Sequence, residues 1–266
     1  GDIGTANNTS DNCYHVVIST GAVGTAELDG FSIIKGQSGG SGSGNLLVNG
    51  IQVSRERGGG LAIASSSPKA QNLIFKGNYG YAGSAIGNTN SSVLLSNVLI
   101  TENLGDFGAI YNNISSPVLR NVTISGNTSP ETANNGTGMR NVTNSFPKLY
   151  NSIIWGNRLS NSTVNNIVNS AGCIPEYYNS IVQNSSSGWT SFGTNGGGNL
   201  DADPLFVNTT LSNYNLQACS PAINAGNNAL IPSGITTDIS GNPRIYETTV
   251  DIGAYEYQSQ KSFSPI

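Results

Sequence analysis

Charged side chains are scarce in this sequence, and their scarcity argues against two kinds of partner. Only 10% of the 266 residues are charged, whereas ordinary soluble domains have about 25%. The net charge is −4, and the 11 Lys and Arg residues are scattered along the chain. Nucleic acid requires a basic patch that neutralises phosphates, and an anionic membrane surface attracts the same kind of patch. We therefore expect no nucleic acid and no anionic membrane surface among the partners.

Long apolar runs, clustered cysteines and a leader sequence are also missing. No run approaches the roughly 18 apolar residues of a membrane span, so we expect no transmembrane segment. Cys13, Cys173 and Cys219 match no metal-ligand spacing, and we interpret them as buried thiols, with one disulfide as the alternative. The sequence opens at Gly1 without the charged and apolar regions of a signal peptide, so export has to be inferred from other features.

Neutral polar residues supply most of the polarity. The chain has 34 Gly residues and is rich in Asn, Ser and Thr, which favour turns over helices. Short triplets of Val, Ile, Leu and Phe recur throughout and can fill a core, which disordered segments cannot do. The composition therefore favours an ordered all-β protein.

One sequence unit recurs five times. Its copies contain QNLIFKGN, SNVLITEN, RNVTISGN, YNSIIWGN and YNSIVQN. They begin at residues 68, 93, 117, 147 and 175, which are 25, 24, 30 and 28 residues apart. A second motif advances in phase with them, at residues 85–88, 109–112 and 138–141. Each period thus has three short apolar segments between polar turns, as one three-sided coil of a parallel β-helix requires.

Stacking of these coils predicts columns of like residues. A short strand placed about 4.8 Å above its copy completes both the hydrogen-bond ladder and the core. One inward column runs from Ala70 to Tyr177, and another runs from Phe75 to Val182. Strand alternation sends other side chains to the opposite face, which is unusually apolar and which we expect to be covered. That face holds Ile74, Leu99, Thr123, Ile153 and Ile181.

Two columns of Asn mark the turns on either side of a strand. Asn tolerates a left-handed backbone, and stacked carboxamides can hydrogen-bond as ladders. We interpret both columns as structural Asn ladders. The first comprises Asn72, Asn97, Asn121, Asn151 and Asn179, and the second comprises Asn78, Asn103, Asn127, Asn157 and Asn184.

The repeat fades after residue 184, and three blocks of a different kind follow. They read DADPLF at residues 201–206, SPAINAG at 220–226 and DIGAYEY at 251–257. An open solenoid end exposes strand edges that have to be covered. We assign residues 1–185 to the coils, with an N-terminal cap that can extend upstream of Gly1. Residues 186–266 form the last coils and a C-terminal cap folding back on them, within the same domain.

These motifs resemble two known families. The A-I-x-N motifs and I-x-G-N strand ends are similar to the GGAI and FxxN repeats of chlamydial polymorphic outer-membrane proteins. The three C-terminal blocks resemble the C-terminal part of the choice-of-anchor Q β-helix proteins of Bacteroidetes. Together the resemblances cover about residues 28–257. They imply a right-handed parallel β-helix that is exported and associated with the outer membrane or bacterial surface. No anchor segment follows Ile266, which leaves the mode of attachment open.

Acidic side chains do not gather in the repeat. A polysaccharide lyase needs two or three carboxylates that hold Ca²⁺ and an Arg or Lys base, yet the column of Glu102 otherwise holds Gly. The best acidic pair is Asp201 and Asp203, which either binds Ca²⁺ or caps a turn. We expect no catalytic residue and no other cofactor. An acidic cluster on adjacent coils would favour an enzyme, with a base drawn from Arg55, Arg57 or Arg140.

Aromatic residues give the remaining binding signal. Tyr150 and Tyr178 share one outward column, and Trp155 points outward from another. Aromatic faces can stack on sugar rings; the alternative is that the C-terminal cap lies over them. The leading hypothesis is a non-catalytic, adhesin-like or glycan-binding surface protein whose partner is an extended polysaccharide or cell-surface glycan. The alternative is a polysaccharide lyase or glycoside hydrolase acting on an acidic polysaccharide, which rests on fold analogy alone.

Overall fold

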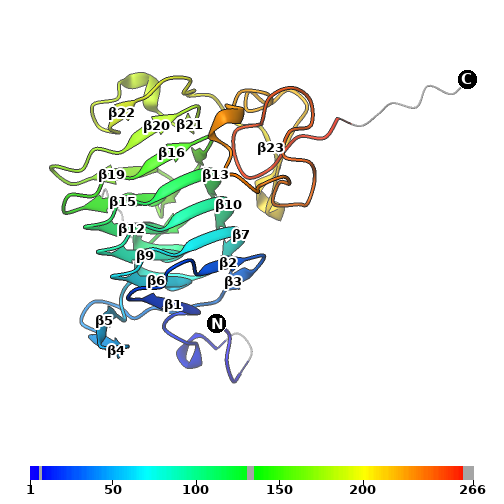
Figure 1. Ribbon diagram of the computed structural model, residues 1–266. Helices are drawn as coiled ribbons and strands as arrows, with labels where there is room; N and C mark the ends of the chain where they lie inside the picture. The colour runs from blue at the N-terminus through cyan, green and yellow to red at the C-terminus, as the bar shows by residue number, and fades with distance from the viewer. Residues whose placement is uncertain (6–7, 131–134, 260–266) are drawn as a thin grey trace, which may run out of the picture.

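The computed structural model describes residues 1–5, 8–130 and 135–259, and it has the all-β solenoid fold that the repeat predicts. Strands of successive coils pair in parallel and stack into three sheets (Figure 1). Within the described ranges the helical elements are short 3₁₀ turns, and none is long or apolar enough to span a membrane. They are η1 (Thr9–Asp11), η2 (Ser185–Ser187), η3 (Thr209–Leu211) and η4 (Asn228–Leu230).

The first sheet takes one strand from each successive coil. Its inward side chains stack in register, so that Ile86 pairs with Leu61 below and Ile110 above. All three are at most 2% exposed. The strands, in spatial order, are β1 (Val17–Thr20), β6 (Leu61–Ala64), β9 (Ile86–Thr89), β12 (Ile110–Asn113), β15 (Met139–Val142) and β19 (Ile167–Asn169).

The second sheet bends at one Asn in every repeat coil. Asn72, Asn97, Asn121, Asn151 and Asn179 all have φ between 46° and 53°, a left-handed conformation that Asn adopts more readily than most residues. The bend turns the sheet without ending the parallel pairing. The strands are β2 (Glu27–Asp29), β3 (Ser32–Ile34), β7 (Lys69–Lys76), β10 (Leu94–Thr101), β13 (Val118–Ser125), β16 (Lys148–Tyr150), β17 (Ile153–Trp155), β20 (Glu176–Tyr178), β21 (Ile181–Val182) and β22 (Thr194–Asn195).

The third sheet closes the coil, and two antiparallel hairpins lie outside the three sheets. The third sheet contains β8 (Tyr79–Ala82), β11 (Leu104–Phe107), β14 (Thr128–Ser129) and β18 (Arg158–Leu159). One hairpin joins β4 (Asn45–Val48) to β5 (Ile51–Ser54), and the other joins β23 (Phe206–Asn208) to β24 (Asn213–Leu216).

The predicted inward columns form the core. Leu95 pairs with Ala70 and Leu119, and the column continues through Leu149 to Tyr177. Every member of both columns is at most 1% exposed. A slip of one residue would move a whole column to the surface, so burial fixes the register. The second column contains Phe75, Ile100, Ile124, Ile154 and Val182.

A ladder of buried carboxamides runs along the corner between the second and third sheets. Asn78, Asn103 and Asn127 each donate from Nδ2 to Oδ1 of the next Asn in the column, over 3.0, 2.9 and 2.8 Å. Asn157 donates in turn to Asn166 over 2.8 Å. These bonds satisfy polar groups that would otherwise be costly to bury.

Asn184, which the sequence places in that column, lies outside the ladder. The last repeat copy is one residue shorter, so the pairing of Ile154 with Val182 puts Asn184 level with Gly156. Both residues have φ 69°. The ladder ends instead at Gln183, whose Oε1 accepts from Asn166 Nδ2 over 3.0 Å.

A further carboxamide ladder lies inside the first sheet. Asn88, Asn112, Asn141 and Asn169 are linked by bonds of 2.8 Å at each step. The first three end the motifs at residues 85–88, 109–112 and 138–141, and the spacing of those motifs alone did not indicate a ladder. The hydrogen bonds between these carboxamides explain why each motif carries Asn at its last position.

Different parts of the region after residue 185 cover the end and the side of the solenoid. Trp189 and Phe192 pack against the main core, and the Trp189 ring lies 5.3 Å from that of Tyr177. We call residues 200–257 the C-terminal segment; it lies beside the stack of coils (Figure 1). Its Leu216, Ala222 and Ile252 pack on Ile153 and Ile181. The cover expected over the apolar outer face is therefore this segment.

Candidate functional site: an aromatic column and a hairpin pocket

The aromatic column predicted from the sequence lies on the outer face of the second sheet. Arg120 on β13, Tyr150 on β16 and Tyr178 on β20 are in register. The two Tyr rings stack with centroids 5.1 Å apart and planes 19° apart. The Arg120 Cζ lies 4.5 Å from the Tyr150 centroid. The repeat has therefore brought the two predicted Tyr residues together.

The faces of these rings are already occupied. Tyr150 lies between Arg120 and Tyr178. The remaining face of Tyr178 meets Gly196, where an added Cβ would lie 2.1 Å from the ring Cε1. A sugar ring stacks on an aromatic face, so this column offers ring edges and hydroxyls to a ligand and no open stacking platform.

Polar groups around the column bind one another. The Tyr178 hydroxyl donates to Glu176 over 2.8 Å, and Glu176 lies 3.1 Å from the Lys148 Nζ. These contacts, led by the Tyr178 hydrogen bond, lower the pKa of Glu176, and contact with Glu176 raises the pKa of Lys148. Arg120 Nη1 donates to the Leu230 carbonyl over 2.6 Å. Internal partners therefore already use much of the hydrogen-bonding capacity here.

Trp155, the other predicted binding residue, is separated from this column. It is half-buried and packs with the C-terminal segment in the second apolar cluster. Its register partner is Ser125 on β13. The structure thus gives Trp155 a packing partner within the chain, which is the alternative that the sequence left open.

Asp201 and Asp203 bind backbone amides at turns. Asp201 accepts from the Asn184 and Ser186 N–H groups, each over 2.9 Å, and from the Ser186 hydroxyl over 2.6 Å. Burial opposes ionisation, but these hydrogen bonds prevail and lower the pKa of Asp201. Asp203 Oδ1 accepts from the Leu205 N–H over 2.9 Å. This is the turn-capping arrangement weighed against Ca²⁺, and no group of three or more candidate metal ligands occurs among the described residues.

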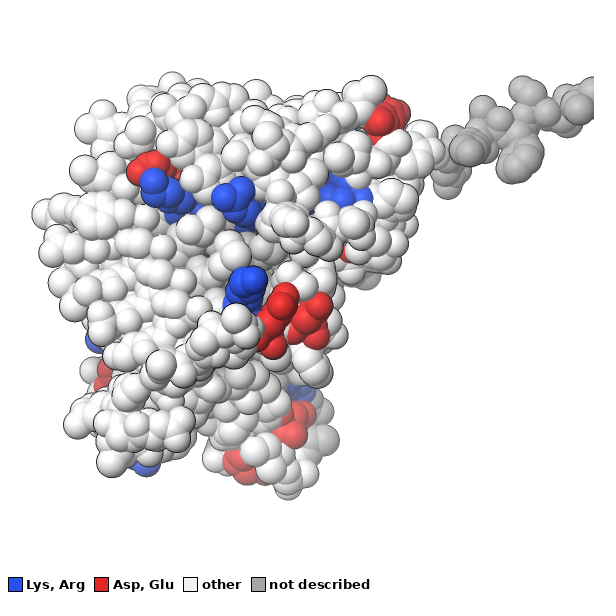
Figure 2. All heavy atoms as spheres, viewed as in Figure 1, with Lys and Arg blue, Asp and Glu red and all other residues white. Residues whose placement is uncertain are grey.

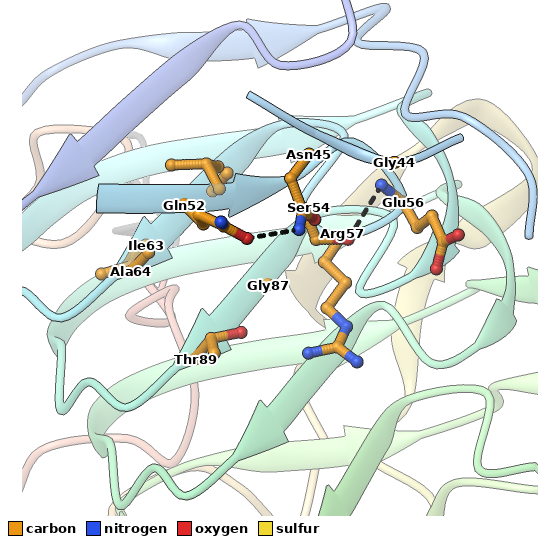
Figure 3. A pocket seen from close by; sticks show the side chains of 12 residues that line it. Gly44, Asn45, Gln52, Ser54, Glu56, Arg57, Ile63, Ala64, Gly87 and Thr89 are labelled. Atoms are coloured by element: carbon orange, nitrogen blue, oxygen red, sulfur yellow. Dashed lines mark hydrogen bonds between the residues drawn. The ribbon is translucent and has the colours of Figure 1, made fainter. Parts of the chain in front are cut away.

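A concave site that the sequence did not point to lies under the β4–β5 hairpin. Val53 of the hairpin packs on Ala62 and Ala64 of the first sheet. Beside this contact the hairpin and the sheet leave a pocket of about 370 Å³, which we call the hairpin pocket (Figure 3). It is lined by Gly44, Asn45, Gln52, Val53, Ser54, Glu56, Arg57, Ala62, Ile63, Ala64, Gly87 and Thr89.

Small residues make the floor of the hairpin pocket, and polar groups make its wall. Ala62, Ala64 and Gly87 carry little or no side chain, so the hairpin and the sheet do not fill the space between them. Asn45 Nδ2 donates to Gln52 Oε1 over 2.8 Å. That bond leaves the side-chain oxygen of Asn45 as an acceptor and the side-chain amide nitrogen of Gln52 as a donor for a ligand, because a carboxamide both donates and accepts.

Arg57 crosses the lower side of this pocket. Its Cζ lies 5.1 Å from the Tyr111 ring centroid, and its guanidinium extends past Gly87 toward Thr89, while Glu56 points the other way (Figure 3). Charged side chains are few on the face of the molecule shown in Figure 2, and several lie next to a charge of the opposite sign. A partly buried guanidinium is therefore a strong local feature in this chain.

Sequence reasoning named Arg57 only as one possible base and did not connect it with Gln52 or Thr89. Among the described residues no other coil carries a hairpin at this position, so periodicity could not place it. The available signal was the Gly-rich stretch at residues 37–44, which interrupts the coil just before β4.

Comparison with known proteins gives no family: no protein-family model matches the chain, and no curated protein matches it. The choice between a glycan-binding protein and a polysaccharide-cleaving enzyme therefore depends on the geometry of the aromatic column and of the hairpin pocket.

Proposed function

We propose that this protein is an exported β-solenoid of the bacterial cell surface that binds an extended glycan through the hairpin pocket and does not cleave it. The observation that carries the proposal is the polar wall over a floor of small residues. Its volume of about 370 Å³ falls within the range of ligand pockets, which begins at about 300 Å³. Glycans present many hydroxyl groups, and each can both donate and accept a hydrogen bond.

The lining suits such a ligand in type as well as in size. Asn45 and Gln52 supply carboxamide groups, and Ser54 and Thr89 supply hydroxyls. These neutral groups pair with sugar hydroxyls at little cost in desolvation compared with charged groups. The pocket lies against β6 and β9 of the first sheet, and the hairpin that walls it is near the N-terminal end of the stack of coils (Figure 1). An extended polymer bound there can continue along the later strands of the first sheet.

Export and surface display are supported by the sequence. The low charge, the abundance of Asn, Ser and Gly, and the resemblance to surface β-helix proteins of Bacteroidetes all favour this location. Accessibility of the protein to added protease on intact producing cells would test it. Complete protection on intact cells, with digestion after lysis, would contradict surface display.

The binding proposal is tested with a glycan array followed by titration of the best ligand. The double variant Asn45→Ala/Gln52→Ala removes two exposed wall groups and should weaken affinity about tenfold, because each neutral hydrogen bond contributes about 0.5–1.5 kcal/mol. Tyr150→Phe, on the aromatic column, serves as the matched control and should leave affinity unchanged. Loss of affinity in Tyr150→Phe alone would move the site to the column.

Chemical analysis of the bound glycan tests the non-catalytic part. We expect its length to be unchanged after prolonged incubation with a large excess of substrate over protein. Shortened or unsaturated products would instead support the lyase or hydrolase alternative.

A further inference from the structure

Arg57 is a cation that faces a pocket and has no anionic partner within the described ranges. The ion pairs there involve other cations: Lys35, Lys76, Lys148 and Arg244. The Arg57 side chain instead makes a cation–π contact with Tyr111, whose ring centroid lies 5.1 Å from the Cζ. In a chain with only 10% charged residues, an unpaired and partly buried guanidinium calls for an explanation.

The position of Arg57 is fixed by the solenoid. Arg57 forms a parallel bridge with Ala82, and Gly58 N–H donates to the Ala82 carbonyl over 3.0 Å. Its backbone lies directly against Gly87, where an added Cβ would be 2.8 Å from the Arg57 carbonyl carbon. A residue held in this way loses little additional conformational entropy when a ligand binds.

The contact with Tyr111 leaves the N–H groups of the Arg57 guanidinium available, since it is a cation–π contact with the Cζ 5.1 Å from the ring centroid. A cation–π contact needs no N–H donor, and the five N–H donors of Arg lie in a planar fork. Two parallel donors match the two oxygens of a carboxylate. Glu56 does not occupy them, since its carboxylate accepts from the Gly42 N–H and points away from Arg57 (Figure 3).

We propose that the hairpin pocket recognises a carboxylate-bearing sugar unit and that Arg57 determines this specificity. The inference rests on the proposed function, because it assigns a chemical class to the glycan bound there. An acidic peptide would also carry carboxylates, but the neutral wall of Asn45, Gln52, Ser54 and Thr89 favours a ligand rich in hydroxyls. The protein as a whole does not attract anions, because its net charge is −4. Attraction between Arg57 and a carboxylate therefore acts only when the ligand is already close, within the Debye length of about 8 Å.

The test is a set of titrations of the full chain with four probes of equal length. They are an oligomer of galacturonic acid, its fully methyl-esterified form, a sulfated oligosaccharide and poly-glutamate. We expect the free acid to bind most tightly and the ester about ten- to a hundredfold more weakly, the factor that a charged hydrogen bond confers. Arg57→Gln should reduce affinity for the free acid by the same factor and leave affinity for the ester unchanged.

Two further variants separate the contributions. Arg57→Lys keeps the charge without the planar fork and should recover only part of the affinity for the acid. Arg55→Gln removes a second guanidinium, which stacks on Tyr14 and does not line the hairpin pocket. It should therefore bind the acid as tightly as the unchanged protein.

The outcomes distinguish this inference from the proposed function. Equal affinity for acid and ester, with no effect of Arg57→Gln, would overturn the carboxylate assignment and leave glycan binding intact. Preference for the sulfated oligosaccharide or for poly-glutamate would also overturn it. If no oligosaccharide on a broad array binds the unchanged protein, the proposed function itself fails.

Discussion

The Nη2 of Arg244 lies 2.9 Å from Oε2 of Glu256, and both side chains are only 1% exposed. Arg244 also donates to the Gly253 carbonyl over 3.2 Å and to the Asn97 Oδ1 over 3.3 Å. Asn97 is on β10, so one buried guanidinium both organises the C-terminal segment and attaches it to the solenoid.

Removal of the cation should be costly at a pH where Glu256 is ionised. We expect Arg244→Met to lower the free energy of unfolding by about 3–5 kcal/mol, because a buried carboxylate loses its partner. The double variant Arg244→Met/Glu256→Gln should lose less, since neither charge then remains buried. Urea unfolding measures the loss, and amide hydrogen exchange shows whether the C-terminal segment opens first. Equal losses in the single and double variants would contradict the ion-pair explanation.

Stability should also depend on pH through Glu256. Burial raises its pKa to about 7 despite the opposing charge of Arg244, and burial likewise raises the pKa of Asp251. Between the ordinary value of about 4.3 and about 7, the folded protein therefore binds more protons than the unfolded chain. The free energy of unfolding should fall as pH rises through this window.

Glu256→Gln provides the control for this pH dependence. Its free energy of unfolding should change less than that of the unchanged protein between about pH 5 and about pH 7.5, with a remaining slope from Asp251. Identical slopes in the two proteins would remove Glu256 as the source.

The repeat predicted the solenoid because each coil stacks on the next, so that a pattern found in one coil has to recur in its neighbours. Residues such as Leu95 and Ile100 recur at constant positions, so their burial followed from period and alternation. The apolar outer face with Ile153 likewise predicted that something must cover it. Asn184 was placed in the wrong column because the copies were matched by their final Asn, although the last copy, YNSIVQN, is one residue shorter; the register with Ile154 shows the shift.

The candidate site was harder to predict, for a different physical reason. Tyr150 and Tyr178 could be paired from the repeat, but the filling of their faces depends on Arg120 and Gly196, one of which lies outside it. The hairpin pocket joins Gln52 on β5 to Thr89 on β9 across a hairpin with no repeat partner. Such contacts depend on the path of an insertion, which periodicity does not determine.

The Asn ladder at the corner should make a large contribution to stability. Asn127 donates to the Ile100 carbonyl and to Asn157, and it accepts from Asn103. Asn127→Ala leaves several of these buried groups without partners, at about 1–3 kcal/mol for each group that finds no water. We therefore expect a loss of at least about 2 kcal/mol in urea unfolding.

Asn184→Gly is the sequence-matched comparison for Asn127→Ala. Asn184 ends the equivalent motif but lies outside the ladder, and Gly readily adopts its left-handed backbone. We expect a change within about 1 kcal/mol. If both substitutions cost the same, the carboxamide ladder is not what makes Asn127 important.

Gly253 is a point of close approach between the C-terminal segment and the outer face of the second sheet. It has φ 107°, and an added Cβ would lie 2.7 Å from Cδ1 of Ile153 and 2.9 Å from Oγ1 of Thr123. Gly253→Ala therefore adds steric overlap to backbone strain. Gly241 has φ 85° but nothing within 4 Å of an added Cβ, so Gly241→Ala should show the strain alone, about 1–2 kcal/mol.

We expect Gly253→Ala to lose a further 1–3 kcal/mol or so beyond that control, because overpacking forces the segment away from β17. Faster amide exchange of the segment than of the repeat coils would locate the damage at this contact. Equal losses for the two alanine variants would mean that the segment can shift at Gly253 without cost. The C-terminal segment would then be only weakly attached over Ile153, and its displacement would expose the apolar outer face to a partner.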